Sequence, residues 1–174
     1  MKKKLLVLLV LLSLVLSSAG YVFAGGSTYG AEGALADQNL TLEEMLTYSI
    51  QDEYIAQAEY ARIICIYGTI NPFANIIKAE GQHIAALEPL FANNGLTVPV
   101  NDAASRVVLP ASLMESYQTG VTAEINNIAM YDKFLAEDLP DEVRTVFDSL
   151  RAASVNHLKA FQKNLDKTAE RDRK

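Results

Sequence analysis

The chain has 174 residues, of which 50% are hydrophobic, and its formal charge is −6. This length and composition suit one domain with a sizeable core. The acidic balance argues against nucleic acid or an anionic membrane surface as a partner. The only cysteine, Cys65, leaves no partner for an internal disulfide, and a rubredoxin-type iron site would need a Cys-x-x-Cys pair. Because Cys65 lies in an apolar run, we expect a buried, inert thiol.

Residues 1–24 have the pattern of a secretory signal peptide. Three lysines at positions 2–4 precede the apolar run 5–16, and Val22-Phe23-Ala24 supplies a small-x-small cleavage site. The alternative is an uncleaved anchor, because residues 5–24 are just long enough to span a bilayer. We expect cleavage and export, with the protein secreted, periplasmic or at the cell surface and no membrane contact afterwards. Loss of the three lysines changes the formal charge from −6 to −9.

The first two predicted helices follow a Gly- and Ala-rich segment, 25–39, that we expect to be a flexible lead-in. The first helix begins at Thr41, where the sequence Thr-Leu-Glu-Glu forms a capping box, and it ends at Gly68. The second begins at Asn71-Pro72, with the asparagine as cap and the proline at the first helical position, and it closes by Gly95.

Two further helices are predicted at about 111–137, with a break near Gly120, and at about 141–167. Four helices of similar length predict an all-α four-helix bundle over residues 40–168, followed by a charged tail at 169–174. Residues 95–110 show no helical period. Fully extended, they could reach about 50 Å, which exceeds the roughly 37 Å of a 25-residue helix. This connection can therefore cross the whole bundle, although its length alone does not decide the topology.

On each predicted helix, polar residues interrupt the apolar stripe at a similar position along the axis of the bundle. Glu80 and His83 form a Glu-x-x-His pair, so both side chains lie on one helix face. At 1.5 Å per residue, the interrupting residues of all four helices fall in one layer about 9 Å deep. The members of this layer are Glu53, Glu80, His83, Glu124 and His157. Glu59 lies on a mixed face of the first helix and is expected to be solvated.

Buried carboxylates predict a metal site in this layer. Each one that lacks a compensating cation costs several kcal/mol, so three together would exceed the whole stability of a typical domain. Divalent ions remove this cost, and carboxylate with imidazole suits iron, manganese or zinc. The alternative is a bundle whose polar stripe is held by hydrogen bonds and water.

The residues resemble the ferritin-like superfamily of rubrerythrin-like di-iron carboxylate bundles. Its members place a glutamate on each of two helices and a Glu-x-x-His on each of the other two. Glu53 and Glu124 match the single glutamates, and Glu80-x-x-His83 matches one pair. The segments 52–56, 79–83 and 154–161 look like an often exported ferritin-like family known only as a domain of unknown function. The likeness extends from about Leu40 to Leu165.

The resemblance implies a ferritin-like bundle with a long crossover between its second and third helices. It also implies one or two iron or manganese ions that react with oxygen or peroxide. Ser154 stands where relatives have a ligating glutamate, which places the second ion in question, and Asn127 could offer only a carbonyl oxygen. Tyr60 and Tyr131 lie two turns from Glu53 and Glu124 on the same stripes, where they could donate hydrogen bonds or accept an electron. As core aromatic residues, they need neither role.

Two functions from different classes remain open on the sequence. The first is an exported di-metal oxidoreductase of the peroxidase or ferroxidase type, whose electrons would come from another protein or from the substrate metal. The second is a non-catalytic helical module that sequesters metal or binds a partner through its acidic surface.

Overall fold

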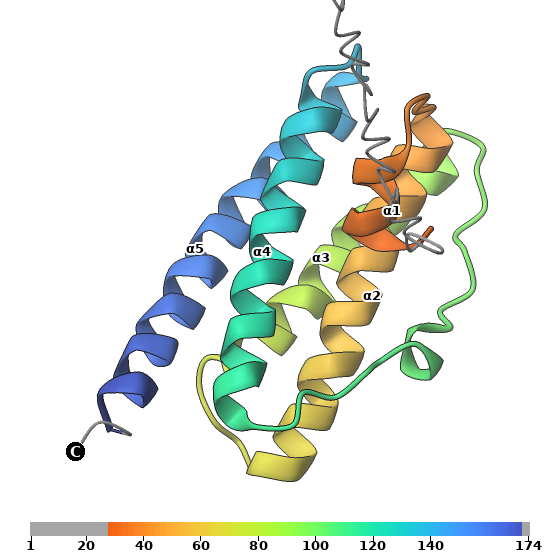
Figure 1. The fold of residues 1–174 in the computed structure, drawn as a ribbon. Helices are drawn as coiled ribbons and strands as arrows, with labels where there is room; N and C mark the ends of the chain where they lie inside the picture. Colours follow the sequence, from red (N-terminus) through yellow and green to blue (C-terminus); the bar gives the residue numbers. More distant parts are fainter. Residues whose placement is uncertain (1–27, 172–174) are drawn as a thin grey trace, which may run out of the picture.

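The computed structural model describes residues 28–171 (Figure 1). These residues form α1 (Gly30–Ala36), α2 (Leu42–Tyr67), α3 (Phe73–Asn93), the 3-10 helix η1 (Ala103–Ser105), α4 (Leu113–Leu135) and α5 (Asp141–Arg171). No strand occurs among them, so the prediction of an all-α protein is confirmed. The predicted signal peptide lies outside the described residues. Within the described part, no helix is both long and apolar enough to cross a membrane.

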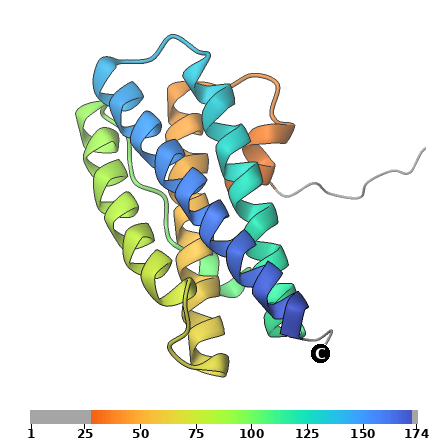
Figure 2. The same cartoon turned by 90° about the vertical axis from the view of Figure 1, so that its left-hand side faces the viewer.

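The four long helices pack as two antiparallel pairs. Helix α2 packs against α3, and α4 packs against α5; α3 also contacts α5, and α2 contacts α4. Figure 1 shows the connection between α3 and α4 running along the outside of the bundle from one end to the other, so that α3 and α4 point the same way. In the view of Figure 2, α5 lies between α3 and α4. The sequence allowed this crossover, and the structure adopts it.

Local signals placed both ends of α2 correctly, but the start of α3 and the end of α5 differ from the prediction. Thr41 caps α2 in a complete capping box with Glu44, and Gly68 ends the helix with a φ of 84°. Helix α3, however, starts one residue later than predicted. Pro72 is its N-cap and makes no side-chain capping bond, so Asn71 is not the cap. Helix α5 extends to Arg171, so residues 169–171 of the predicted tail are helical.

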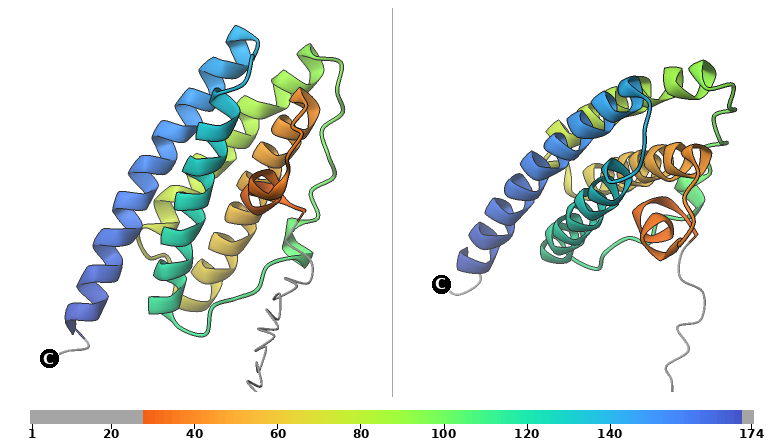
Figure 3. Two further views of the ribbon diagram at one scale, coloured as in Figure 1. Left: turned by 45° about the horizontal axis from the view of Figure 1, so that its top comes forward. Right: turned by 90° about the horizontal axis from the view of Figure 1, so that it is seen from above.

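The predicted lead-in is ordered where the structure describes it. Helix α1 packs against α2 and α4, as the end-on view in Figure 3 shows, and it buries Ala31 and Ala34. The N–H of Ala31 donates to Asp52 Oδ1 at 2.8 Å, and Lys133 Nζ donates to the carbonyls of Ala34 and Asp37. Small residues permit this close packing, so here they indicate a docked helix rather than a flexible segment.

Gly120 lies inside a continuous α4, and the predicted break does not occur. A Cβ at this position would lie 2.7 Å from the ring of Phe161 on α5. The glycine therefore allows the close approach of two helices. Cys65 also differs from expectation, because its thiol is exposed near the end of α2 rather than buried.

Two apolar clusters fill the bundle, one on each side of a polar layer along the bundle axis. The upper cluster, nearer the start of α2, includes Ile50, Leu87 and Leu150. The lower cluster, nearer the end of α2, includes Ile63 and Phe161. On each long helix, the residues of the polar layer lie in sequence between members of the two clusters. The apolar packing therefore encloses the layer from both ends of the bundle.

Candidate metal centre

All five residues predicted for the polar layer lie together in the structure. Glu53 comes from α2, Glu80 and His83 from α3, Glu124 from α4 and His157 from α5. The three glutamates are 3%, 3% and 5% exposed, so they are removed from bulk water. Helical periodicity directs each side chain inward, because each lies on the same stripe as the core residues of its own helix.

The imidazole of His83 lies between two carboxylates. Its Nδ1 is 2.9 Å from Glu80 Oε2 and 3.0 Å from Glu53 Oε2. On the other side of Glu80, His157 Nδ1 is 3.5 Å from Glu80 Oε1 and 3.4 Å from Glu124 Oε1. Glu80 thus faces one histidine with each of its oxygens. The two rings stack with centroids 5.7 Å apart.

Two groups of ligand atoms result from this arrangement. One contains Glu53, Glu80 and His83, and the other contains Glu80, Glu124 and His157. Within each group, one atom from each residue lies within 4.8 Å of the others. Two carboxylate oxygens and one imidazole nitrogen form a donor set that divalent iron, manganese and zinc accept. The residues present therefore fit one or two metal ions.

The electrostatics of the layer show why a cation is favourable. Burial and the neighbouring charge of Glu53 raise the pKa of Glu80 well above its usual value. Burial would also raise the pKa of Glu53, but hydrogen bonds from His83 and Glu80 outweigh it and hold the pKa below the usual value. Burial would lower the pKa of His83, but both carboxylates outweigh it and raise the pKa to about 10. Without metal, protons compensate the buried charge.

Two buried tyrosines donate hydrogen bonds to the outer carboxylates, each to the glutamate of the other helix rather than to the one on its own stripe. Tyr131 Oη donates to Glu53 Oε1 at 3.2 Å, and Tyr60 Oη donates to Glu124 Oε1 at 3.5 Å. Burial, together with these carboxylates, raises the pKa of each phenol well above 10, so both keep their protons. Each glutamate therefore has one oxygen held by a tyrosine.

Asn127 and Ser154 contact each other rather than the Glu/His groups. Ser154 Oγ donates to Asn127 Oδ1 at 2.6 Å, and Asn127 Nδ2 donates to Asp52 Oδ2 at 2.6 Å. The amide oxygen considered as a ligand is thus engaged elsewhere. Asp52 was not among the residues predicted for the site. Burial raises its pKa to about 7, although the hydrogen bond from Asn127 opposes this shift. The sequence signal available for Asp52 was its position directly before Glu53.

Glu59 is also placed differently from expectation. Its carboxylate is partly buried rather than solvated, and burial raises its pKa to about 7. It belongs to neither Glu/His group. No sequence signal identified it, because the segment that covers it comes from the distant connection between α3 and α4.

Comparison with known proteins supports the fold. No family model matches the sequence, and no curated protein matches it. Among solved structures, the chain is similar to a hypothetical protein from Methanococcus jannaschii, with a TM-score of 0.66 over 76% of this chain and 85% of that chain. At 21% identity, this likeness concerns the fold alone. Fold and site together define an all-helical bundle with two buried Glu/His groups that share one carboxylate and could hold a metal ion.

Proposed function

We propose that this chain is an exported ferritin-like protein that binds one or two iron or manganese ions and uses them in redox chemistry with peroxide or oxygen. The observation that carries the proposal is Glu80. This buried carboxylate belongs to both Glu/His groups. Among the described residues, the ion-pair partners of the three buried glutamates are histidines, with no lysine or arginine. A metal ion would replace the protons that otherwise compensate these buried carboxylates.

Two features support the finer assignment to a ferritin-like bundle. The long connection makes α3 and α4 parallel, which a bundle with short loops throughout would not do. The glutamates also lie on all three of α2, α3 and α4 at one level. Export is supported by the sequence pattern at residues 1–24.

The metal would supply electron transfer to peroxide or oxygen, and the chain would supply its environment. Glu53, Glu80 and His83 would hold one ion, and Glu80 would share a second with Glu124 and His157. Tyr131 and Tyr60 orient the outer carboxylates, and the apolar clusters exclude water from above and below. His83 must lose a proton before its Nδ1 can bind metal, so metal binding releases protons.

A second candidate is metal sequestration without turnover. The observation that favours it is Ser154, whose hydroxyl is bound to Asn127 and leaves the group on the α5 side without an added carboxylate. A centre with one filled site would store or deliver an ion without the two-metal chemistry of the resemblance.

Metal analysis followed by an activity assay separates these functions. Purified full-length protein is loaded anaerobically with Fe²⁺ or Mn²⁺, washed, and measured for bound metal. Peroxide consumption is then followed with a reductant present. Bound metal with peroxide consumption that is lost in Glu80→Gln supports the redox function. Bound metal without consumption supports sequestration. No uptake of iron, manganese or zinc would overturn both.

A further inference from the structure

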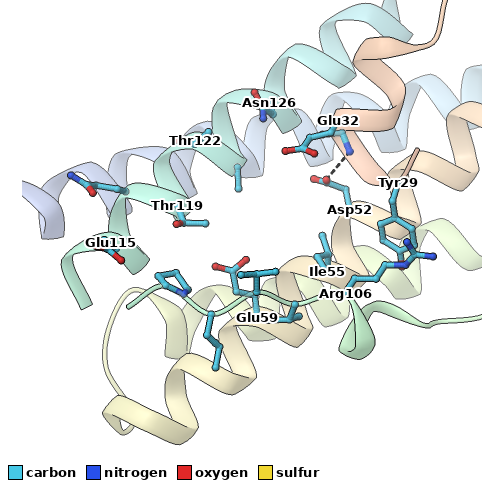
Figure 4. Close-up of a pocket in the computed structure, with 17 residues that line it drawn as sticks. Tyr29, Glu32, Asp52, Ile55, Glu59, Arg106, Glu115, Thr119, Thr122 and Asn126 are labelled. Carbon is cyan, nitrogen blue, oxygen red and sulfur yellow. Dashed lines mark hydrogen bonds between the residues drawn. The ribbon is translucent and has the colours of Figure 1, made fainter. Parts of the chain in front are cut away.

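A second polar site lies outside the metal centre, in a pocket between α2, α4 and the connection that joins α3 to α4 (Figure 4). The pocket has a volume of about 720 Å³, which is ample for a small organic molecule. None of the five residues of the metal centre lines it. Its apolar wall is formed by Ile55, Val107, Leu109 and Pro110.

Glu59 is the polar residue of this pocket that lacks a partner. Figure 4 shows its carboxylate directed into the space between α2 and α4, towards Thr119 on α4. Glu59 Oε1 is buried and accepts no hydrogen bond from any described residue. A buried acceptor without a donor is unfavourable, so a donor from a bound molecule would remove this cost.

The other charged groups of the pocket are already engaged or exposed. Asp52 accepts from the Ala31 N–H and from Asn127, and Glu115 Oε2 accepts from the Ala111 N–H at 2.8 Å. Arg106, the cation at the rim, pairs with Asp102 at 2.6 Å outside the pocket lining. Glu32 is exposed. The pocket is thus electronegative, and its unmet hydrogen-bonding capacity is at Glu59.

The carboxylates of the pocket do not form a metal site. Within residues 28–171, the groups of three ligand atoms that converge closely enough for a metal are those of the polar layer, and Glu59 is in neither. An anion would meet repulsion from the acidic lining. A cationic group would supply the missing donor and suit the acidic lining. The apolar wall suits a hydrocarbon portion on the same molecule.

We propose that this pocket binds a small alkylammonium compound, whose ammonium group donates to Glu59 while its hydrocarbon chain packs against Ile55, Leu109 and Pro110. The hydroxyls of Thr119 and Thr122, which line α4 opposite Glu59, can accept the remaining ammonium hydrogens. This site is independent of the metal centre and does not require a metal to be bound.

Titration of the full-length protein with four simple probes tests the proposal. The probes are n-butylammonium, methylammonium, 1-butanol and butyrate, at a pH near 8 where Glu59 is ionised, with binding measured by ligand-observed NMR. We expect n-butylammonium to bind at least tenfold tighter than each of the others. The comparison with 1-butanol isolates the charge, and the comparison with methylammonium isolates the apolar contact.

Two matched variants locate the site. Glu59→Gln should lower the affinity for n-butylammonium at least tenfold, to the level of 1-butanol. Glu88→Gln removes the same charge from an exposed position on α3 and should leave the affinity unchanged. Equal binding of amine and alcohol, or an amine preference that survives Glu59→Gln, would overturn the proposal. Absence of binding by any probe would also overturn it and leave the pocket to water alone.

Discussion

Replacing Glu80 by glutamine should remove most of the stabilisation that a divalent metal gives this protein. Glu80 belongs to both Glu/His groups, with Oε2 2.9 Å from His83 Nδ1 and Oε1 3.5 Å from His157 Nδ1. Glutamine keeps the shape of the side chain but removes its charge. The substitution should therefore weaken both sites and disturb the packing little.

The expected size follows from the charge that is lost. At a metal concentration a thousandfold above Kd, binding at one site stabilises the fold by about 4 kcal/mol. Two unit charges 4 Å apart interact by about 4 kcal/mol at an effective dielectric constant of 20. We therefore expect the substitution to weaken metal binding by ~2.7 kcal/mol, which is less than this full interaction and raises Kd about a hundredfold. The stabilisation then falls to about 1.4 kcal/mol at the same metal concentration. For a chain of this size, the difference is roughly 5–11 °C in Tm.

Thermal unfolding with and without Mn²⁺, followed by circular dichroism, measures this effect. Without metal, Glu80→Gln should be at least as stable as the unmodified protein, because burial already disfavours the ionised form of Glu80 and raises its pKa. Glu88→Gln, on the exposed side of the same helix, should keep the full metal-induced shift. Equal metal-induced shifts in the unmodified protein and Glu80→Gln would refute the reasoning.

Three further predictions test other parts of the structure. Ser154→Glu adds a carboxylate near the α5 side of the layer and should raise the number of metal ions bound per chain towards two. An anaerobic titration of the unmodified protein that shows two sites of equal affinity would contradict this. Burial raises the pKa of Glu59 to about 7 from a usual 4.5, so the folded state binds this proton more tightly than the unfolded state and loses stability as pH rises through that window. Glu59→Gln should therefore raise the free energy of unfolding by about 1–2 kcal/mol at pH near 8 and leave it unchanged at pH near 4, as measured by urea denaturation. The same increase at both pH values would exclude a charge effect. Gly120→Ala places a Cβ 2.7 Å from the Phe161 ring and should cost about 1–3 kcal/mol, whereas Gly81→Ala meets only the end of a flexible glutamine at 3.3 Å and should leave Tm nearly unchanged; equal Tm values would disprove the close-packing argument.

The helices and their inward faces were predictable because their signals are local. A capping box at Thr41, a glycine at position 68 and an apolar stripe act within a few residues of chain. The same periodicity placed Glu53, Glu80 and Glu124 inside, since a residue on the core stripe of its own helix faces the bundle axis. These three glutamates, together with His83 and His157, could therefore be named from the sequence, while metal binding itself stays a prediction.

Errors arose where a residue's environment is made by distant segments. Small residues in α1 suggested flexibility, yet Lys133 and Asp52 hold this helix against the bundle. The apolar run around Cys65 suggested burial, but the thiol is exposed near the end of α2. Glu59 looked solvated until the crossing connection formed one side of its pocket.

The sequence by itself determined that the chain is helical and which face of each helix carries the glutamates and histidines, because helical period depends only on the order of residues. Only the tertiary structure decided that α3 and α4 run parallel, that Glu80 lies between His83 and His157, and that Asn127 bonds to Ser154 and Asp52 rather than joining the Glu/His groups. The physical reason is that periodicity sets a side chain's direction about its own helix axis. The distance to side chains on neighbouring helices depends on how those helices pack.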